Sequence, residues 1–215
     1  MQGLGPRSLV SADSLVSGPP PDLTPPETPF VAPIILVGMM GAGKTTIGRA
    51  LARAMNREFV DVDLVIEART GVKIPTIFEV EGETGFRRRE TATIDEFTRR
   101  SGVVLATGGG AVVAPQNQRL LAERGIIIYL RARAEELYAR TRYDKNRPLL
   151  QTADPLGRIT ELLEARQPLY ERLADVVVDT GRHPIPRLVQ RLIPQLQACV
   201  KPVADPSTLP PLEKL

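Results

Sequence analysis

Hydrophobic and polar residues alternate along the chain in blocks, with five short strand-like runs separated by segments of helical spacing. The strand-like runs are residues 33–37, 58–60, 103–106, 126–130 and 175–178. Runs of this kind are typical of strands buried on both faces of a sheet. Helical spacing is found over residues 44–55, 64–68, 84–100, 115–124, 134–142, 154–172 and 186–200. Strands that alternate with helices predict an α/β fold, in which right-handed crossovers build a parallel sheet.

The two ends of the chain show neither helical spacing nor strand-like runs. Residues 1–33 hold 8 of the 20 prolines, and four prolines interrupt residues 201–215. Such segments cannot bury enough apolar surface to offset the entropy lost on ordering them. We therefore predict a disordered, proline-rich extension over 1–33, one folded domain over 34–200 and a flexible tail over 201–215.

Composition narrows the class of protein. A chain of 215 residues with 42% hydrophobic and 25% charged residues suits a single α/β domain. No run approaches the roughly 18 apolar residues of a membrane span, and no basic stretch followed by an apolar segment marks the N-terminus. The single cysteine, Cys199, cannot form an internal disulfide or a zinc site. We expect a cytoplasmic protein without membrane contact.

The charge pattern bears on a nucleic-acid partner. The net charge is +3 and the calculated pI about 9.2. Acidic residues are interspersed with the arginines, and the sharpest basic cluster, residues 87–89, is followed at once by Glu90. This pattern fits a mixed solvated surface with a few anion-binding positions better than a nucleic-acid-binding face, so we expect no nucleic-acid partner.

A phosphate-binding motif follows the first predicted strand. Residues 38–45, GMMGAGKT, match G-x-x-x-x-G-K-[ST] between a buried strand and a helix. Gly41 and Gly43 let successive N–H groups converge on phosphate oxygens at the helix N-terminus, whereas an ordinary glycine-rich turn is the alternative. Lys44 would reach the β- and γ-phosphates, and Thr45 would offer its hydroxyl to Mg²⁺. The residues of this loop expected to bind ATP are Gly41, Ala42, Gly43, Lys44, Thr45 and Thr46.

The candidate carboxylates for metal binding and proton transfer follow the second predicted strand. The third predicted strand ends Leu-Ala-Thr, without the acid of a Walker B pattern, but Asp61 and Asp63 follow the second strand. Side chains alternate along an extended segment, so these two acids are expected on one side of it. One can hold Mg²⁺ through water, and the other can accept a hydrogen bond from a substrate hydroxyl and help to remove its proton. Asp63 is alternatively the N-cap of the helix that follows, and the two roles are compatible.

Three consecutive glycines, residues 108–110, follow the third predicted strand. Ligands of open α/β folds bind at this end of a parallel sheet. A loop without side chains can bring its N–H groups close to a ligand oxygen, and a bare flexible turn is the alternative. The triplet alone does not decide between them.

Taken together, these motifs resemble the shikimate kinase family over about residues 34–200. The matching segments are 38–48 (GMMGAGKTTIG), 61–63 (DVD), 85–90 (GFRRRE), 105–110 (LATGGG), 147–150 (RPLL) and 166–170 (RQPLY). The resemblance implies a three-layer P-loop kinase fold of the nucleoside-monophosphate-kinase type, with a five-stranded parallel sheet and helices on both faces. It implies a monomer that transfers the γ-phosphoryl group of ATP to the 3-hydroxyl of shikimate, on the pathway to chorismate and aromatic amino acids. It places Thr45 and Asp61 at the Mg²⁺ ion.

The resemblance also assigns the acceptor site. Asp63 would bind the substrate hydroxyls and act as the base. Arg87 and Arg166 would grip the substrate carboxylate, for which a guanidinium offers two parallel hydrogen bonds. Glu90 would orient Arg87, and Gly109 would donate its backbone N–H to the substrate.

Two larger regions follow from the same resemblance. Residues 61–95 would form the substrate-binding region, and residues 140–152 a lid that closes over ATP and excludes water. Arg147, in the lid, is the catalytic candidate, because a guanidinium can neutralise charge that develops on the transferring phosphoryl group. Arg142 and Arg182 are weaker candidates for contact with ATP.

Alternatives remain for these arginines and for the function. Residues 87–89 could be a solvated helix face, and Arg166 a surface ion-pair partner. Another kinase of the same scaffold, for nucleoside monophosphates or gluconate, is the nearest rival function. A nucleotide-dependent switch that binds nucleic acid is a rival of another class. The paired aspartates and the triple glycine favour a hydroxylated acid as the acceptor.

Overall fold

The computed structural model describes residues 31–143, 150, 152–181 and 184–199. Apart from residues 31–33, the predicted proline-rich extension lies outside this part of the chain, and so does the predicted tail.

Five parallel strands form one sheet in the order β2-β3-β1-β4-β5. The strands are β1 (Ile34–Val37), β2 (Glu58–Asp61), β3 (Val103–Ala106), β4 (Ile126–Arg131) and β5 (Val176–Asp179). Every residue of β1 and β3 is buried, as their continuous apolar runs predicted. In the central strand β1, Ile35 lies opposite Leu105 on one side and Ile127 on the other. The predicted five-stranded parallel sheet is confirmed.

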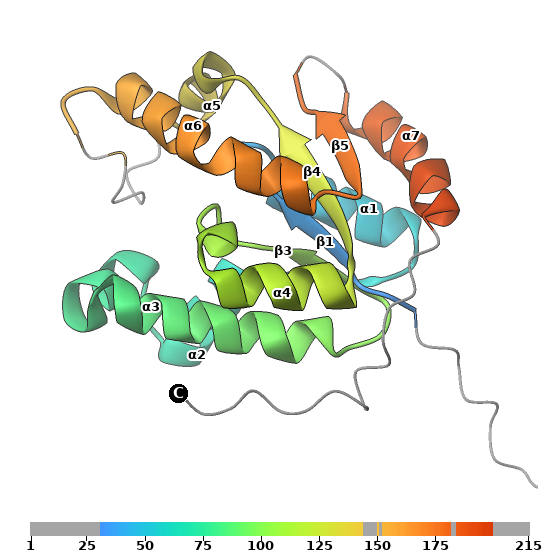
Figure 1. Cartoon of the computed structure of the whole chain (residues 1–215), viewed down its shortest axis with the longest axis horizontal. Coiled ribbons are helices and arrows are strands. Elements are labelled where there is room, and N and C mark those ends of the chain that lie inside the picture. The colour runs from blue at the N-terminus through green and yellow to red at the C-terminus, as the bar shows by residue number, and fades with distance from the viewer. Residues whose placement is uncertain (1–30, 144–149, 151, 182–183, 200–215) are drawn as a thin grey trace, which may run out of the picture.

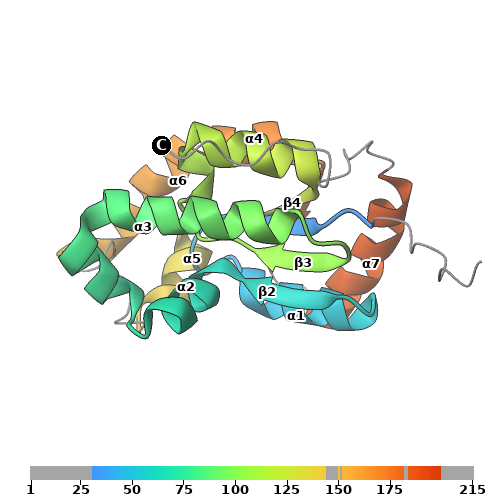
Figure 2. The same ribbon diagram turned by 90° about the horizontal axis from the view of Figure 1, so that it is seen from below.

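Seven α-helices of the described residues cover the two faces of this sheet. They are α1 (Lys44–Ala54), α2 (Val62–Thr70), α3 (Ile74–Thr98), α4 (Pro115–Arg124), α5 (Ala134–Thr141), α6 (Pro155–Leu173) and α7 (Ile185–Ala198), with a short 3-10 helix η1 (Ala111–Val113). Helices α1 and α7 pack together on one face, and α3, α4 and α6 lie on the other (Figures 1 and 2). The predicted three-layer arrangement is confirmed. None of these helices is both long and apolar enough to cross a membrane.

One helix differs clearly from its predicted extent. Helix α3 begins at Ile74, whereas the spacing predicted a start at residue 84. The two parts join at Gly82, whose φ of 69° and ψ of −178° are not helical. The added turns were missed because this kink interrupts the apolar stripe, so residues 74–81 show too short a repeat to be recognised.

The backbone around the paired aspartates also differs from the prediction. Only Asp61 ends strand β2, whereas Asp63 lies in the first turn of α2 and not in an extended segment. The N-cap is Asp61, whose Oδ1 accepts a hydrogen bond from the Leu64 N–H at 3.5 Å. Both the period-two argument and the proposed cap at Asp63 were therefore wrong, because the chain turns into the helix two residues earlier than predicted.

Candidate active site

The loop after β1 has the backbone that a phosphate-binding loop needs. Gly41 has a φ of 79° and Gly43 a φ of 96°, a left-handed conformation that glycine adopts without steric cost. Gly43 lies directly before α1, so the loop leads into the N-terminus of that helix. The Lys44 ammonium donates to the carbonyl oxygens of Gly38 and Met39 at 2.8 and 3.0 Å. The lysine thus lies against the loop that would hold the phosphates.

The other residues of the loop occupy different surroundings. Ala42 is buried, whereas Thr46 is exposed at the start of α1. Thr45 Oγ1 donates to Asp61 Oδ2 at 2.7 Å, which joins α1 to the end of β2. In the described ranges, no three acidic, histidine or cysteine side chains come together as a metal site. Mg²⁺ commonly takes only one or two protein oxygens and completes its shell with phosphate and water, so the Thr45–Asp61 pair fits it.

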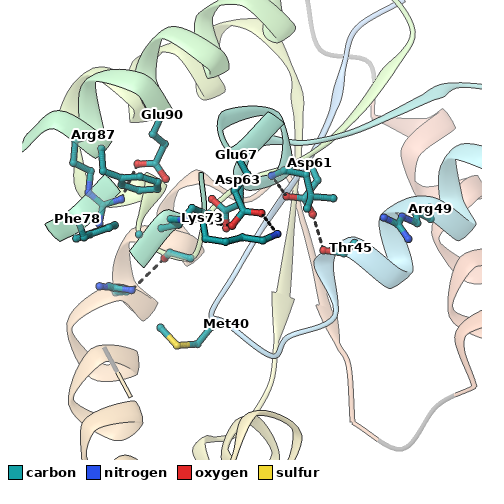
Figure 3. A pocket seen from close by; sticks show the side chains of 17 residues that line it. Met40, Thr45, Arg49, Asp61, Asp63, Glu67, Lys73, Phe78, Arg87 and Glu90 are labelled. Carbon is teal, nitrogen blue, oxygen red and sulfur yellow. Dashed lines mark hydrogen bonds and ion pairs between the residues drawn. The ribbon is translucent and has the colours of Figure 1, made fainter. Parts of the chain in front are cut away.

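A pocket of about 520 Å³ opens beside this pair, a volume suited to a small molecule. In Figure 3, Thr45 and Asp61 lie at one end, Arg87 and Glu90 at the other, and Asp63 between them. The predicted site residues that line the pocket are Thr45, Asp61, Asp63, Arg87, Glu90, Gly109 and Arg166. The sequence motifs therefore predicted residues that the fold brings together from β2, α1, α2, α3, α6 and the loop after β3.

Several other lining residues were not among the predicted site residues. Phe78 and Phe86 line the pocket, with their ring centroids 4.8 Å apart. Lys73 and Glu67 also line it and form an ion pair at 2.8 Å. Arg49 joins them from α1. No sequence pattern pointed to these charged residues, because an isolated charge on a helix is most often solvated surface.

Arg87 is held by two glutamates of its own helix. Its Nη1 lies 2.7 Å from Glu90 Oε2, and its Nη2 lies 3.0 Å from Glu83 Oε1. Glu90 is fully buried, and burial raises the pKa of its carboxyl although Arg87 opposes the shift. Burial lowers the pKa of Arg87, but the two glutamates outweigh it and leave that pKa raised. The Arg87 guanidinium therefore lies at one end of the pocket between two carboxylates that favour its charged form.

The solvated-face alternative applies to the neighbours of Arg87 and not to Arg87 itself. Arg88 and Arg89 are exposed, and Arg89 pairs with Glu81 at 2.6 Å across the kink of α3. Arg166 is buried, with 8% of its surface exposed, and its Nη1 donates to the Gly109 carbonyl oxygen at 3.4 Å. It is thus not a surface ion-pair partner.

The three glycines allow a close approach between elements. None of them has a positive φ, so their backbone conformation does not require glycine. A Cβ at Gly108 would lie 2.6 Å from Glu90 Oε1 and 3.1 Å from Asp63 Oδ1. A Cβ at Gly110 would overlap the Arg87 guanidinium. The loop therefore packs directly against functional side chains of α2 and α3, which neither sequence interpretation predicted.

Most of the predicted lid falls outside the described residues, and so do two of the arginines expected at ATP. This holds for Arg147, for Arg182 and for residues 144–149 and 151. Arg142 follows α5 and lies over the Tyr143 ring at 4.7 Å.

Arg140 was missed as a separate candidate, although it lies in the predicted lid. Its Nη1 donates to the Gly41 carbonyl oxygen at 3.2 Å, and its Nη2 donates to the Thr180 carbonyl oxygen at 2.8 Å. It thereby joins the phosphate-binding loop to the segment after β5. One arginine among many carries no signal of such a bridge in the sequence.

Comparison with known proteins agrees with this geometry. A family model described as "Shikimate kinase" matches residues 40–197. The chain is 61% identical over 173 residues to the shikimate kinase of Bordetella pertussis, covering 80% of this chain and 82% of that protein. It is similar to the structure of the shikimate kinase from Acinetobacter baumannii in complex with shikimate, with a TM-score of 0.76, 46% identity, and coverage of 80% and 96%. A gluconokinase from Sinorhizobium meliloti shares only the fold, at 18% identity and a TM-score of 0.54. By its matched residues and by the identity of these relatives, the chain belongs to the shikimate kinase family.

Proposed function

We infer that this chain transfers the γ-phosphoryl group of ATP to the 3-hydroxyl of shikimate, giving shikimate 3-phosphate and ADP. The observation that carries this inference is the composition of one pocket beside the phosphate-binding loop. A carboxylate, Asp63, lies between the Thr45–Asp61 pair and Arg87. Such a pocket is complementary to an acceptor that has hydroxyls at one end and a carboxylate at the other. The related Acinetobacter baumannii enzyme is described in complex with shikimate. The product would enter the pathway to chorismate and aromatic amino acids.

We assign the ATP side to the loop and to four cationic side chains. On ATP binding, Lys44 would exchange its two carbonyl partners for the β- and γ-phosphates. Arg147 would stabilise charge on the transferring phosphoryl group, and Arg142 and Arg182 would contact the nucleotide. Phosphoryl transfer depends mainly on positioning and on charge stabilisation, which these residues supply.

The Thr45–Asp61 pair would hold the magnesium ion. Its hydroxyl and carboxylate oxygens are 2.7 Å apart and are the hard donors that this ion prefers. When bound, Mg²⁺ would supply positive charge that offsets part of the negative charge of the phosphates. The second oxygen of Asp61 accepts from the Leu64 N–H, which orients the carboxylate toward Thr45.

On the acceptor side, Asp63 would accept a hydrogen bond from the substrate hydroxyl and take its proton during transfer. Arg87 and Arg166 would bind the substrate carboxylate, and Gly109 would donate its N–H. Arg87 is preoriented by buried Glu90. We further propose that the protein works as a monomer, as the family resemblance implies. We place it in the cytoplasm, because a single cysteine fits a reducing compartment.

The test is ADP release with MgATP and a panel of acceptors: shikimate, gluconate, AMP, CMP and none. Wild type is compared with Asp63→Asn and Arg87→Ala, and with Arg88→Ala as a control at the exposed neighbouring arginine. Turnover confined to shikimate, lost in the first two variants and kept in the control, supports the function and both roles. Turnover of AMP or gluconate instead would overturn the acceptor assignment. No turnover with any acceptor would favour a nucleotide-dependent switch.

A further inference from the structure

Tyr170 connects the acceptor pocket to the sheet from a fully buried position. It lies in α6 four residues after Arg166, so the two side chains share one face of the helix. Its hydroxyl donates to the Gly109 carbonyl oxygen at 2.5 Å and lies 3.6 Å from Met39 Sδ. Its ring stacks on Tyr129 of β4, with centroids 5.0 Å apart and planes at 20°. Burial raises the pKa of its hydroxyl, which therefore stays protonated and able to donate.

The Gly109 carbonyl thus has two donors of different kinds. Tyr170 is the nearer, at 2.5 Å, whereas Arg166 Nη1 is at 3.4 Å. If Arg166 turns to bind a substrate carboxylate, the carbonyl depends on the tyrosine alone. The carbonyl is partly buried, and leaving it without a donor would cost stability, so the tyrosine hydroxyl lowers the cost of that turn.

The same hydrogen bond orients an N–H group. The Gly109 carbonyl and the Gly110 N–H belong to one trans peptide, so they point in opposite directions and move together. Within the described part of the chain, neither the Gly109 N–H nor the Gly110 N–H donates to an acceptor. Both glycines line the pocket. Because Tyr170 fixes the carbonyl, the Gly110 N–H of the same peptide would be oriented to donate to a ligand oxygen.

We propose that Tyr170 is a positioning residue of the acceptor site: its hydroxyl fixes the Gly109–Gly110 peptide and releases Arg166 to bind the substrate carboxylate. The proposal rests on the proposed function, because it needs a carboxylate-bearing acceptor in this pocket. It concerns binding of the acceptor and not of ATP.

The test is Tyr170→Phe, which removes only the hydroxyl and keeps the stacked ring. We expect the dissociation constant and the KM of shikimate to rise about 5- to 30-fold, as for loss of one hydrogen bond to a partly buried carbonyl. The KM of ATP should stay within about twofold of wild type. Shikimate binding is measured by titration calorimetry, and the two KM values by ADP release.

The matched control is Tyr129→Phe, which removes the other hydroxyl of the same ring stack. In the described ranges that hydroxyl is buried and has no hydrogen-bond partner, so its loss should leave shikimate binding unchanged. Equal weakening of shikimate binding in both variants would overturn the proposal, because the effect would then come from the stacked rings and not from the Tyr170 hydroxyl. Unchanged shikimate binding in Tyr170→Phe, with or without a lower melting temperature, would also overturn it, and so would a parallel rise in the KM of ATP. Absence of shikimate turnover in wild type would instead refute the proposed function.

Discussion

Replacing Gly108 by alanine tests whether the triple-glycine loop needs its glycines for close approach. The new Cβ would lie 2.6 Å from Glu90 Oε1, where ordinary contacts are 3.4 Å or longer. Glu90 cannot retreat freely, because it is fully buried and its other oxygen holds Arg87 at 2.7 Å. Any shift of the glutamate therefore displaces the guanidinium that we assign to the substrate carboxylate.

The size of the effect follows from the overlap. Forcing extra atoms into a well-packed site costs about 1–3 kcal/mol. Since tenfold in an equilibrium constant corresponds to about 1.4 kcal/mol, we expect Gly108→Ala to raise the KM of shikimate by about 5- to 150-fold if this cost falls on the substrate-binding geometry. The KM of ATP should change little, because the phosphate-binding loop is not part of the clash.

The measurement is steady-state ADP release, first with shikimate varied at saturating MgATP and then with ATP varied. The control is Gly125→Ala, at the opposite end of the sheet before β4, where a Cβ would lie 2.9 Å from the Pro33 carbonyl oxygen and would overlap Ile35. This variant should lower stability without changing the KM of shikimate. A wild-type KM of shikimate in Gly108→Ala, or an equal rise in the KM of ATP, would refute the close-approach argument.

Three further substitutions address the charges around the site and the core. Burial raises the pKa of Glu90 above 4.5, so this carboxyl takes up its proton at a higher pH than usual and loses its hold on Arg87 there. As pH falls, kcat/KM for shikimate should therefore decline in wild type at a higher pH than an ordinary glutamate would cause. Dividing the wild-type kcat/KM by that of Glu90→Gln at each pH should isolate this decline, because the titration of shikimate itself affects both enzymes equally. Asp95→Asn breaks an ion pair with Arg124, whose side chain is 5% exposed, and should lower the free energy of unfolding in urea by about 3–5 kcal/mol with an unchanged KM of shikimate. Asp61→Asn should raise the Mg²⁺ concentration for half-maximal activity about 10- to 100-fold at constant KM of shikimate.

For each of these three substitutions, one outcome would contradict the prediction. A pH-independent ratio of wild type to Glu90→Gln would show that the glutamate does not control Arg87. Unfolding of Asp95→Asn at the wild-type urea concentration would mean that the Asp95–Arg124 pair contributes little. An unchanged Mg²⁺ requirement in Asp61→Asn would remove the aspartate from the metal site.

The fold could be predicted from the sequence where one signal dominates. Strands β1 and β3 are buried on both faces, so their apolar runs are continuous and unambiguous. The strand order could not be predicted, because parallel crossovers fix handedness and not which strands become neighbours. The first part of α3 was missed since Gly82 interrupts its periodicity.

Several residues that line the pocket were predicted, but the contacts among them were not. Asp63 lines it as expected, but from a helix turn and not from an extended segment. Residue types pointed to Asp63, and the family resemblance added Arg87 and Arg166. The contacts that orient these groups, such as Tyr170 on the Gly109 carbonyl, join positions far apart in the chain. No local pattern encodes such a contact.

These contacts attach both predicted carboxylate-binding arginines to one short loop. Gly110 packs against the Arg87 guanidinium, while the Gly109 carbonyl accepts from Arg166. A displacement of the loop therefore changes the positions of both cations at once, although α3 and α6 supply them separately. Substitutions that move this loop from either side act on one shared element, so their effects on shikimate binding should not be additive. Gly109 and Gly110 thus form the structural link between the two arginines, so a carboxylate bound at one arginine would also constrain the other.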